Sequence, residues 1–219
     1  MKNKYNMTLE QNIFLAKRNL VKNIYSNARM EGINITFPQT QTILDGVNVP
    51  SLKIDDIQCI LNLRDAWKFV IANINEEFNL NFICKINEYV ARNESLEWGK
   101  LRTGKVEMTG TNYIPDIPNK TQTDADISKI IQIENVTQRA ITYMLYGIRK
   151  QLFWDGNKRT STIAANKIMI ENGAGIIKIP DNRLEEFNTL LTEYYNTNNM
   201  EKISKFIYDN CIDGLIINE

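Results

Sequence analysis

The sequence contains no histidine among its 219 residues. Histidine has the ordinary pKa closest to neutrality, and it is the commonest general base and metal ligand in enzymes. Its absence excludes Ser-His-Asp triads, Cys-His dyads and histidine-ligated zinc. Any acid–base chemistry therefore has to use a carboxylate, lysine, tyrosine, cysteine, the substrate or water.

Cysteine is also scarce, with three residues at Cys59, Cys84 and Cys211. Their number is odd, their spacing is wide, and each lies in an apolar helical pattern. These features are typical of buried free thiols rather than of disulfides or a cysteine metal site. They agree with a reducing compartment.

The chain has neither an excess of one charge nor a long hydrophobic run. The 26 Lys and Arg residues balance 26 Asp and Glu residues, so there is no general attraction to nucleic acid or to an anionic membrane. No apolar run approaches the ~20 residues that span a bilayer, and the polar start MKNKYNMTLEQ resembles neither a signal peptide nor an anchor. We expect a cytoplasmic protein that binds neither nucleic acid nor membranes, and any anion site has to be built locally.

Apolar residues recur at helical spacing along most of the chain, which predicts a mainly α fold. Thr8 and Gln11 form a capping-box pattern, and the helix that they begin is expected over 8–31, before Gly32. The other expected helices are 38–45, 55–74, 79–90 with Asn79 as its cap, 123–133, 135–152, 158–172, 182–196 and 200–211. We divide the chain into an N-terminal helical arm, 1–50, and a core, 51–219.

One segment has a strand-like pattern. In LRTGKVEMTGTNYIPDIP, residues 101–118, Val106 and Met108 alternate with polar residues, and Gly104 and Gly110 interrupt the pattern. This alternation predicts a short β-hairpin followed by an extended tail.

The segment QLFWDGNKRTS, residues 151–161, has the components of an anion site. Gly156 lets a ligand approach the backbone, and the start of the next helix offers unpaired N–H groups. Lys158 and Arg159 add positive charge where a helix start alone would favour acidic residues. Asp155 is suited to hold a magnesium ion that bridges phosphate oxygens. The alternative is an ordinary turn followed by a solvated helix start.

These residues resemble the signature of the Fic/Doc (Fido) family, HxFx[D/E]GN[G/K]RxxR in its Fic branch and HxFxDANKRT in its Doc branch. The matching residues, in order and without a gap, are Phe153, Asp155, Gly156, Asn157, Lys158 and Arg159. Gln151 stands at the histidine position, and Thr162 stands at the second arginine position. The chain is thus identified as an atypical family member, with a Fic-fold helical bundle and a short β-hairpin flap.

Two further segments support the resemblance. Residues 101–118 are similar to the family's flap hairpin, at which a target protein docks. NARMEGINIT, residues 27–36, is similar to the inhibitory-helix motif [S/T]xxxE[G/N], with Glu31 and Gly32 at the matching positions. The resemblance therefore implies that Glu31 and Gly32 are regulatory. Separately, a hairpin with an exposed edge would let an unidentified target protein dock by strand addition at Lys105, Val106, Glu107 and Met108. The alternative is a hairpin that only covers the core. Because Thr162 replaces the usual partner of the inhibitory glutamate, Glu31 has to pair with Lys158 or Arg159.

The resemblance implies transfer of AMP from ATP to a Ser, Thr or Tyr hydroxyl of a target protein, with Mg²⁺ and ATP or another nucleotide bound. By position, Phe153 and Asp155 belong to the catalytic loop, Asp155 holds the metal, and the nucleotide phosphates contact Gly156, Asn157, Lys158 and Arg159. Gln151 has no basic nitrogen and cannot replace the histidine as a base. Losing a general base typically lowers the rate about 10²–10⁴-fold without abolishing positioning and charge stabilisation.

Three alternatives for function follow from these departures. The first is a transferase with weak or altered activity, and the second is an inactive pseudoenzyme that binds nucleotide or a protein partner. The third is Doc-like phosphoryl transfer, which the NKRT sequence favours. Trp98 and Trp154 are candidates for stacking on adenine, although packing is the commoner role of a tryptophan in a helical protein.

Overall fold

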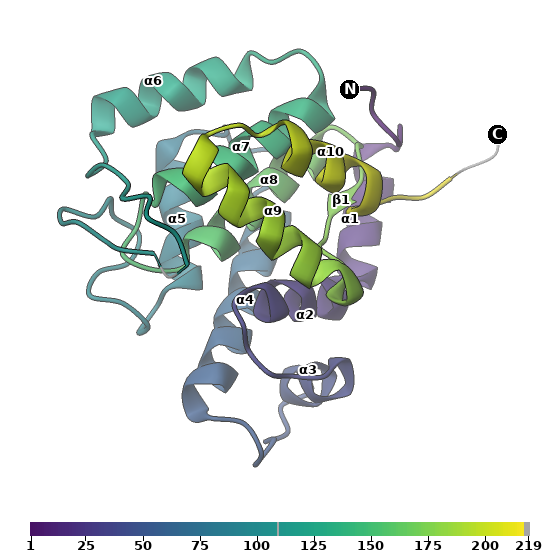
Figure 1. Ribbon diagram of the computed structural model, residues 1–219. Helices are drawn as coiled ribbons and strands as arrows, with labels where there is room; N and C mark the ends of the chain where they lie inside the picture. Colours follow the sequence, from purple (N-terminus) through teal and green to yellow (C-terminus); the bar gives the residue numbers. More distant parts are fainter. Residues whose placement is uncertain (109, 217–219) are drawn as a thin grey trace.

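The structure is a computed structural model that describes residues 1–108 and 110–216. Over these residues the chain forms ten α-helices and one two-stranded antiparallel sheet, which confirms the mainly α prediction (Figure 1). The helices are α1 Leu9–Arg18, α2 Leu20–Met30, α3 Phe37–Leu44, α4 Ile54–Ala72, α5 Leu80–Val90, α6 Lys120–Ile131, α7 Val136–Lys150, α8 Asn157–Glu171, α9 Leu184–Thr197 and α10 Glu201–Asn210. The strands are β1 Ile176–Ile177 and β2 Ile212–Asp213.

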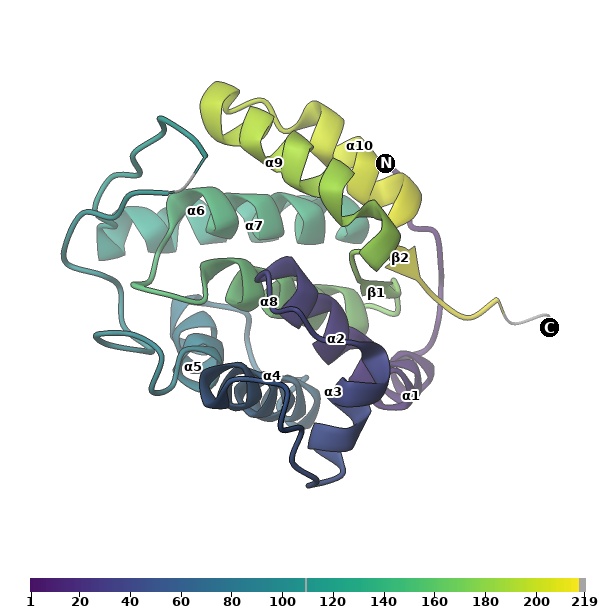
Figure 2. The same ribbon diagram turned by 60° about the horizontal axis from the view of Figure 1, so that its bottom comes forward.

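Helix α8 is the centre of the bundle. Figure 2 shows α7 on one side of it and α4 and α5 on the other, with α9 and α10 beyond α7. All its residues are buried except Lys158 and Glu171. Because α8 is almost wholly buried, its first turn is fixed in place against the loop that precedes it.

The long N-terminal helix predicted over 8–31 is two helices. The capping box at Thr8 is present, but the chain breaks at Asn19, which has φ −98° and ψ 14° and separates α1 from α2. Asparagine is a poor helix former, since its side chain competes for backbone hydrogen bonds. The break allows α1 to pack on α8 while α2 packs on α4 and α8, and it directs the end of α2 toward the start of α8.

The predicted hairpin at 101–118 is wrong: the described part of this segment contains no strand. Pro115 and Pro118 have no backbone N–H to give to a ladder. The buried Arg102 holds the segment instead, donating from Nη2 to the carbonyl oxygens of Pro115 and Asp116 at 3.2 and 2.6 Å and from Nη1 to that of Gly104. One side chain thus takes the place of cross-strand pairing.

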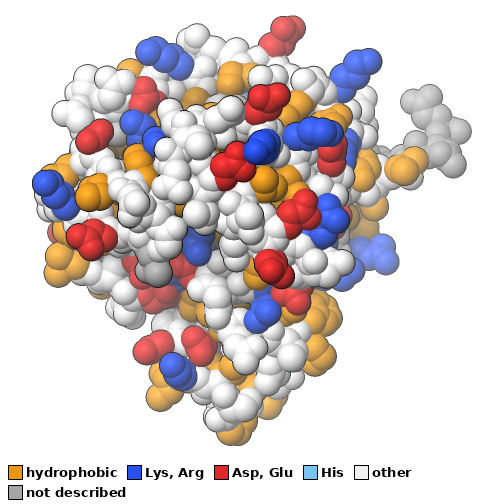
Figure 3. Space-filling view, in the orientation of Figure 1, with side chains coloured by type: hydrophobic (Ala, Val, Ile, Leu, Met, Phe, Trp, Pro, Cys, Tyr) orange, Lys and Arg blue, Asp and Glu red, His pale blue; other side chains and the backbone are white. Residues whose placement is uncertain are grey.

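The remaining helix predictions are confirmed within a few residues. Asn79 caps α5, and its side chain accepts a hydrogen bond from Phe82 N. The three cysteines are free thiols, two of them buried. On the face shown in Figure 3, basic and acidic side chains are interspersed. Among the described helices, none is both long and apolar enough to span a membrane.

Candidate active site

The loop between α7 and α8 is closed by Asn157. Its Oδ1 accepts a hydrogen bond from Phe153 N at 2.9 Å, and its Nδ2 donates to Phe153 O at 2.8 Å and to Gln151 Oε1 at 3.0 Å. Gln151 ends α7 in the left-handed conformation with φ 49°, and its Nε2 donates to Ile148 O at 2.7 Å. Both ends of the Gln151 carboxamide are therefore fixed by the loop itself.

Gly156 precedes the first residue of α8 and has φ 72°, a backbone conformation that residues other than glycine rarely adopt. A Cβ atom here would lie 2.8 Å from Val90 Cγ1, so the close approach to α5 also requires glycine. The Asp155 carboxylate accepts a hydrogen bond from Gly156 N. The backbone carbonyl oxygen of Asp155 accepts a hydrogen bond from Asn87 Nδ2 at 3.0 Å. Asn87 is fully buried in α5, and sequence reasoning missed it because a single asparagine in an apolar helix carries no motif.

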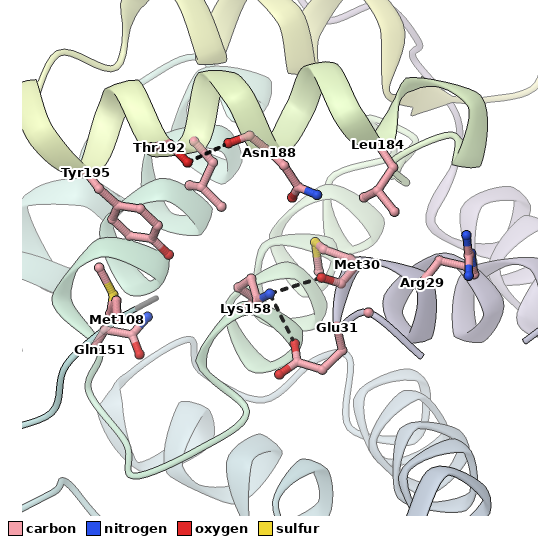
Figure 4. Close-up of a pocket in the computed structure, with 12 residues that line it drawn as sticks. Arg29, Met30, Glu31, Met108, Gln151, Lys158, Leu184, Asn188, Thr192 and Tyr195 are labelled. Atoms are coloured by element: carbon pink, nitrogen blue, oxygen red, sulfur yellow. Dashed lines mark hydrogen bonds and ion pairs between the residues drawn. The ribbon is translucent and has the colours of Figure 1, made fainter. Parts of the chain in front are cut away.

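A pocket of about 550 Å³ lies over the first turn of α8. Figure 4 shows Lys158 at its centre, Gln151 and Met108 at one side, and side chains of α9 opposite. The α9 residues that line it include Asn188, Thr192 and Tyr195. Sequence reasoning missed these three because helical periodicity identified only the buried face of α9.

Tyr195 faces Gln151 across this pocket. Burial raises the pKa of Tyr195, and the negative charge of Glu31 raises it further. The phenol therefore stays protonated near neutral pH, so it can donate a hydrogen bond but does not act as a base. Neither Tyr195 nor Gln151 replaces the missing histidine as a proton acceptor.

Arg159 is 2% exposed and is surrounded by carboxylates. Its Nη1 lies 2.6 Å from Glu94 Oε2, and its Nη2 lies 3.6 Å from Glu31 and 3.4 Å from Asp155. Burial alone would lower the pKa of Arg159, but Glu31 and Glu94 outweigh burial and raise it. Nη1 also contacts Cys59 Sγ at 2.9 Å, and burial raises the pKa of that thiol to about 12. Sequence reasoning missed Glu94, which follows α5 outside any motif.

Arg159, Asp155 and Glu94 line a second cavity, of about 410 Å³. Glu31 lines both cavities. One Glu31 oxygen lies 3.7 Å from Lys158 Nζ, which itself donates to Met30 O at 3.0 Å. The side chain that ends α2 thus stands between the two spaces, and it makes the ion pairs with Lys158 and Arg159 that the sequence indicated.

The structure divides the predicted site residues among two cavities, the buried segment between them and the flap. Gln151, Lys158 and Met108 line the first cavity, whereas Asp155 and Arg159 line the second. Phe153, in the loop, and Asn157, the first residue of α8, are buried between them. In the flap, Lys105 and Glu107 are exposed, while Val106 and Met108 are half-buried. Thr162, at the second arginine position, donates its hydroxyl to Lys158 O at 2.9 Å and leaves Glu31 without a partner there.

Trp154 packs on the flap rather than lining either cavity. A Cβ atom on Gly104 would lie 2.5 Å from its ring. Trp98 is 36% exposed on the loop after α5 and likewise lines neither cavity. Trp154 is thus a packing residue, and neither tryptophan is placed to stack on a base bound in these two cavities.

The residues around Asp155 fit a magnesium ion that takes most of its ligands from phosphates. Within 1–108 and 110–216, no group of three or more Cys, Asp or Glu residues is arranged to hold a metal ion. Asp155 contributes one partly exposed carboxylate beside the helix start. Magnesium typically takes one or two protein carboxylates and completes its shell with waters and substrate phosphates.

Residues 77–169, from the end of the α4–α5 loop through most of α8, match the Fic/DOC family. The chain carries a Fic domain. Its sequence is 24% identical over 204 residues to the protein adenylyltransferase Fic of Drosophila persimilis, across 86% of this chain. This chain spans only 38% of the length of that relative.

Solved structures confirm the Fic fold beyond the 77–169 region. Residues 134–508 of Fic-1 from Caenorhabditis elegans superpose with a TM-score of 0.75 at 20% identity, covering 88% of this chain and 60% of that one. A Fic domain containing signaling protein from Bacteroides thetaiotaomicron gives a TM-score of 0.73 at 15% identity, covering 92% and 85% of the two chains. At these identities the likeness concerns the fold.

Proposed function

We propose that this Fic domain binds a nucleotide through its phosphates at the start of α8 and transfers AMP from ATP to a protein hydroxyl slowly, without a general base. The observation that carries the proposal is the 550 Å³ pocket over the first turn of α8, with Lys158 in its wall. Helix starts favour anions, and Lys158 adds a full positive charge. The distant similarity to protein adenylyltransferases supports ATP as the nucleotide.

The chain's residues suggest how slow transfer proceeds. The hydroxyl oxygen of the target attacks the α-phosphorus, the bond to the β-phosphate oxygen breaks, and pyrophosphate leaves. Gln151 orients the hydroxyl through the remaining lone pair of its Oε1, because Asn157 occupies only one. The hydroxyl proton passes to water. Compared with a histidine at this position, we expect a rate about 10²–10⁴-fold lower.

Asp155 would hold Mg²⁺, which when bound neutralises charge on the phosphates. Arg159 is unsuited to contact phosphate directly while Glu94 and Glu31 hold it, so its role here is to position Asp155 and Glu31. Lys158 remains the cation closest to an incoming phosphate. Glu31 opposes binding, since its carboxylate pairs with Lys158 and would repel the phosphate.

We also propose that the target protein docks along 105–108. The residues alternate between exposed and half-buried positions, as in a strand, and no backbone hydrogen bond to another segment occupies this stretch among the described residues. A segment with this alternation and with no backbone partner of its own suits strand addition by a peptide. Four exposed apolar side chains on the flanking loops add contact area: Leu96, Trp98, Ile114 and Ile117.

A nucleotide-binding pseudoenzyme is the second candidate. The observation that favours it is the fixed carboxamide of Gln151, whose Nε2 and Oε1 are both bonded within the loop. In this case the site binds nucleotide with the same residues and releases it unchanged.

Calorimetric titration with ATP, ADP and AMP in the presence of Mg²⁺ tests binding. We expect Lys158→Ala to weaken ADP binding at least tenfold, whereas Lys68→Ala, an exposed lysine of α4, should have no effect. Equal affinity in both variants would overturn the phosphate site.

Incubation with labelled ATP and a cell lysate tests transfer. Gln151→His should raise AMP incorporation at least 100-fold, and Asp155→Ala should abolish it. Incorporation by the natural chain that depends on Asp155 favours slow transfer, whereas binding without incorporation favours the pseudoenzyme. A histidine variant that binds ATP but stays inactive would contradict an adenylyltransferase site.

A further inference from the structure

A separate cavity of about 340 Å³ lies between α6, α7 and α9. Its walls include Ile130 of α6, Tyr146 of α7 and Tyr194 of α9, together with Met200. It shares no lining residue with the pocket over α8. Its volume falls within the range of small-molecule sites, which are usually apolar with a few convergent polar groups.

Positive charge predominates around this cavity. Lys129, Arg149 and Lys150 line it, and none of the three makes an ion pair within the part of the chain that the structure describes. The one acidic lining residue, Asp126, is already occupied: its Oδ2 accepts from the Tyr146 hydroxyl at 3.1 Å and its Oδ1 from Gln122 Nε2 at 2.7 Å. The unpaired charge therefore favours an anion.

Contacts with two tyrosines hold the Arg149 side chain beside the cavity. Its guanidinium lies over the Tyr113 ring at 3.8 Å, and its Nη2 donates to the carbonyl oxygen of Tyr195 at 3.2 Å. Its Nε is buried without any hydrogen-bond partner among the described residues. That atom lies too deep to contact a ligand in the cavity, so the guanidinium would meet an anion through its remaining N–H groups.

We propose that this cavity binds a small organic anion, with a carboxylate or phosphate group at Arg149 and Lys150 and an apolar body against Tyr146, Tyr194 and Ile130. The tyrosine rings suit a flat or aliphatic body. The three cations favour an anion over a neutral ligand of the same shape. Arg149 bonds to Tyr195 O, and Tyr195 lines the pocket over α8, so the anion site adjoins the proposed nucleotide site through one residue.

Ligand-observed NMR and calorimetry with phenyl phosphate, benzoate and neutral benzamide test this site on the full chain. We expect at least one of the two anions to bind saturably and at least tenfold more tightly than benzamide, and whichever binds identifies the anionic group. Arg149→Gln and Lys150→Gln should each weaken that binding at least fivefold, while Lys68→Gln leaves it unchanged. Lys150 makes no side-chain hydrogen bond among the described residues, so its variant stays informative even if loss of Arg149 destabilises the fold.

Competition separates this site from the pocket over α8. Excess ADP should not displace the anion, and Lys158→Ala, which tests the nucleotide site, should leave anion binding unchanged. Displacement by ADP, equal binding of benzamide, or full binding in both the Arg149 and Lys150 variants would overturn the proposal. These results are independent of whether ADP itself binds.

Discussion

Replacing Glu94 with alanine should lower the free energy of unfolding by about 2–4 kcal/mol. Glu94 makes the shortest ion pair to Arg159, at 2.6 Å, and the guanidinium is 2% exposed. The other Glu94 oxygen accepts from the buried Asn62 at 2.7 Å, which fixes the carboxylate in place. The substitution therefore leaves a buried cation without its main hydrogen-bonded counter-ion.

The magnitude follows from what remains around Arg159. Breaking a buried ion pair by removing one partner typically costs about 3–5 kcal/mol. Glu31 and Asp155 stay within 3.6 Å of Nη2, and they compensate part of that loss. For a chain of this length, about 1 kcal/mol corresponds to a Tm shift of roughly 2–4 °C, so a loss of about 2–4 kcal/mol should lower Tm by about 4–16 °C.

Urea unfolding followed by circular dichroism measures this change, with Asp181→Asn as the matched control. Asp181 pairs with Arg29 at a similar distance, 2.7 Å, but the two side chains are 44% and 27% exposed. Exposed pairs contribute about 0–1 kcal/mol, so the control should lose less than 1 kcal/mol. If Glu94→Ala and Asp181→Asn destabilise the protein equally, then Glu31 and Asp155 alone satisfy Arg159 and the reasoning from burial is refuted.

Three further outcomes are expected. Glu31→Gln should tighten ADP binding about 5–30-fold in calorimetry, because a charge 3.7 Å from Lys158 no longer repels the phosphates; unchanged affinity would show that Glu31 does not oppose the nucleotide. Burial raises the pKa of Cys59 and Cys211 to about 12, so their contribution to stability is complete below the ordinary thiol pKa of ~8.5 and is lost as pH rises toward 12. A thiol reagent at pH 8 should accordingly modify these two residues at least ~100-fold faster in urea than in the folded state, and equal rates would contradict their burial. Arg102→Ala should expose the flap to limited proteolysis while Lys100→Ala does not, and equal cleavage would mean that other contacts hold the flap.

Local signals predicted most of the helices because their causes are local. Asn79 caps α5 with its own side chain, and the capping box of Thr8 needs only residues three positions apart. The anion-site loop was recognisable for the same reason, since Gly156 and Asn157 act within one turn of α8. Structures that depend only on neighbours in the sequence can therefore be predicted from the sequence.

The two predictions that were wrong, one helix over 8–31 and a hairpin at 101–118, concern segments whose structure depends on residues far away in the sequence. The apolar stripe of 8–31 continues through Asn19, and only packing of α1 on α8 requires the break. The alternation of Val106 and Met108 is real, but Arg102 supplies the contacts that a partner strand would have made. Glu94 and the α9 residues that line the pocket lie at the site only because of the tertiary structure, so no spacing in the sequence predicts them.

The Arg102 contacts have a consequence for how the flap tolerates substitution. All the acceptors that Arg102 meets in the flap and at Gln151 are backbone carbonyl oxygens, which every residue type carries. Arg159 depends instead on three carboxylates, each of which a single substitution removes. The flap should thus keep its anchor to the end of α7 while its own side chains vary, whereas the contacts of α8 with Glu31 and with the loop after α5 depend on the residue type at each position.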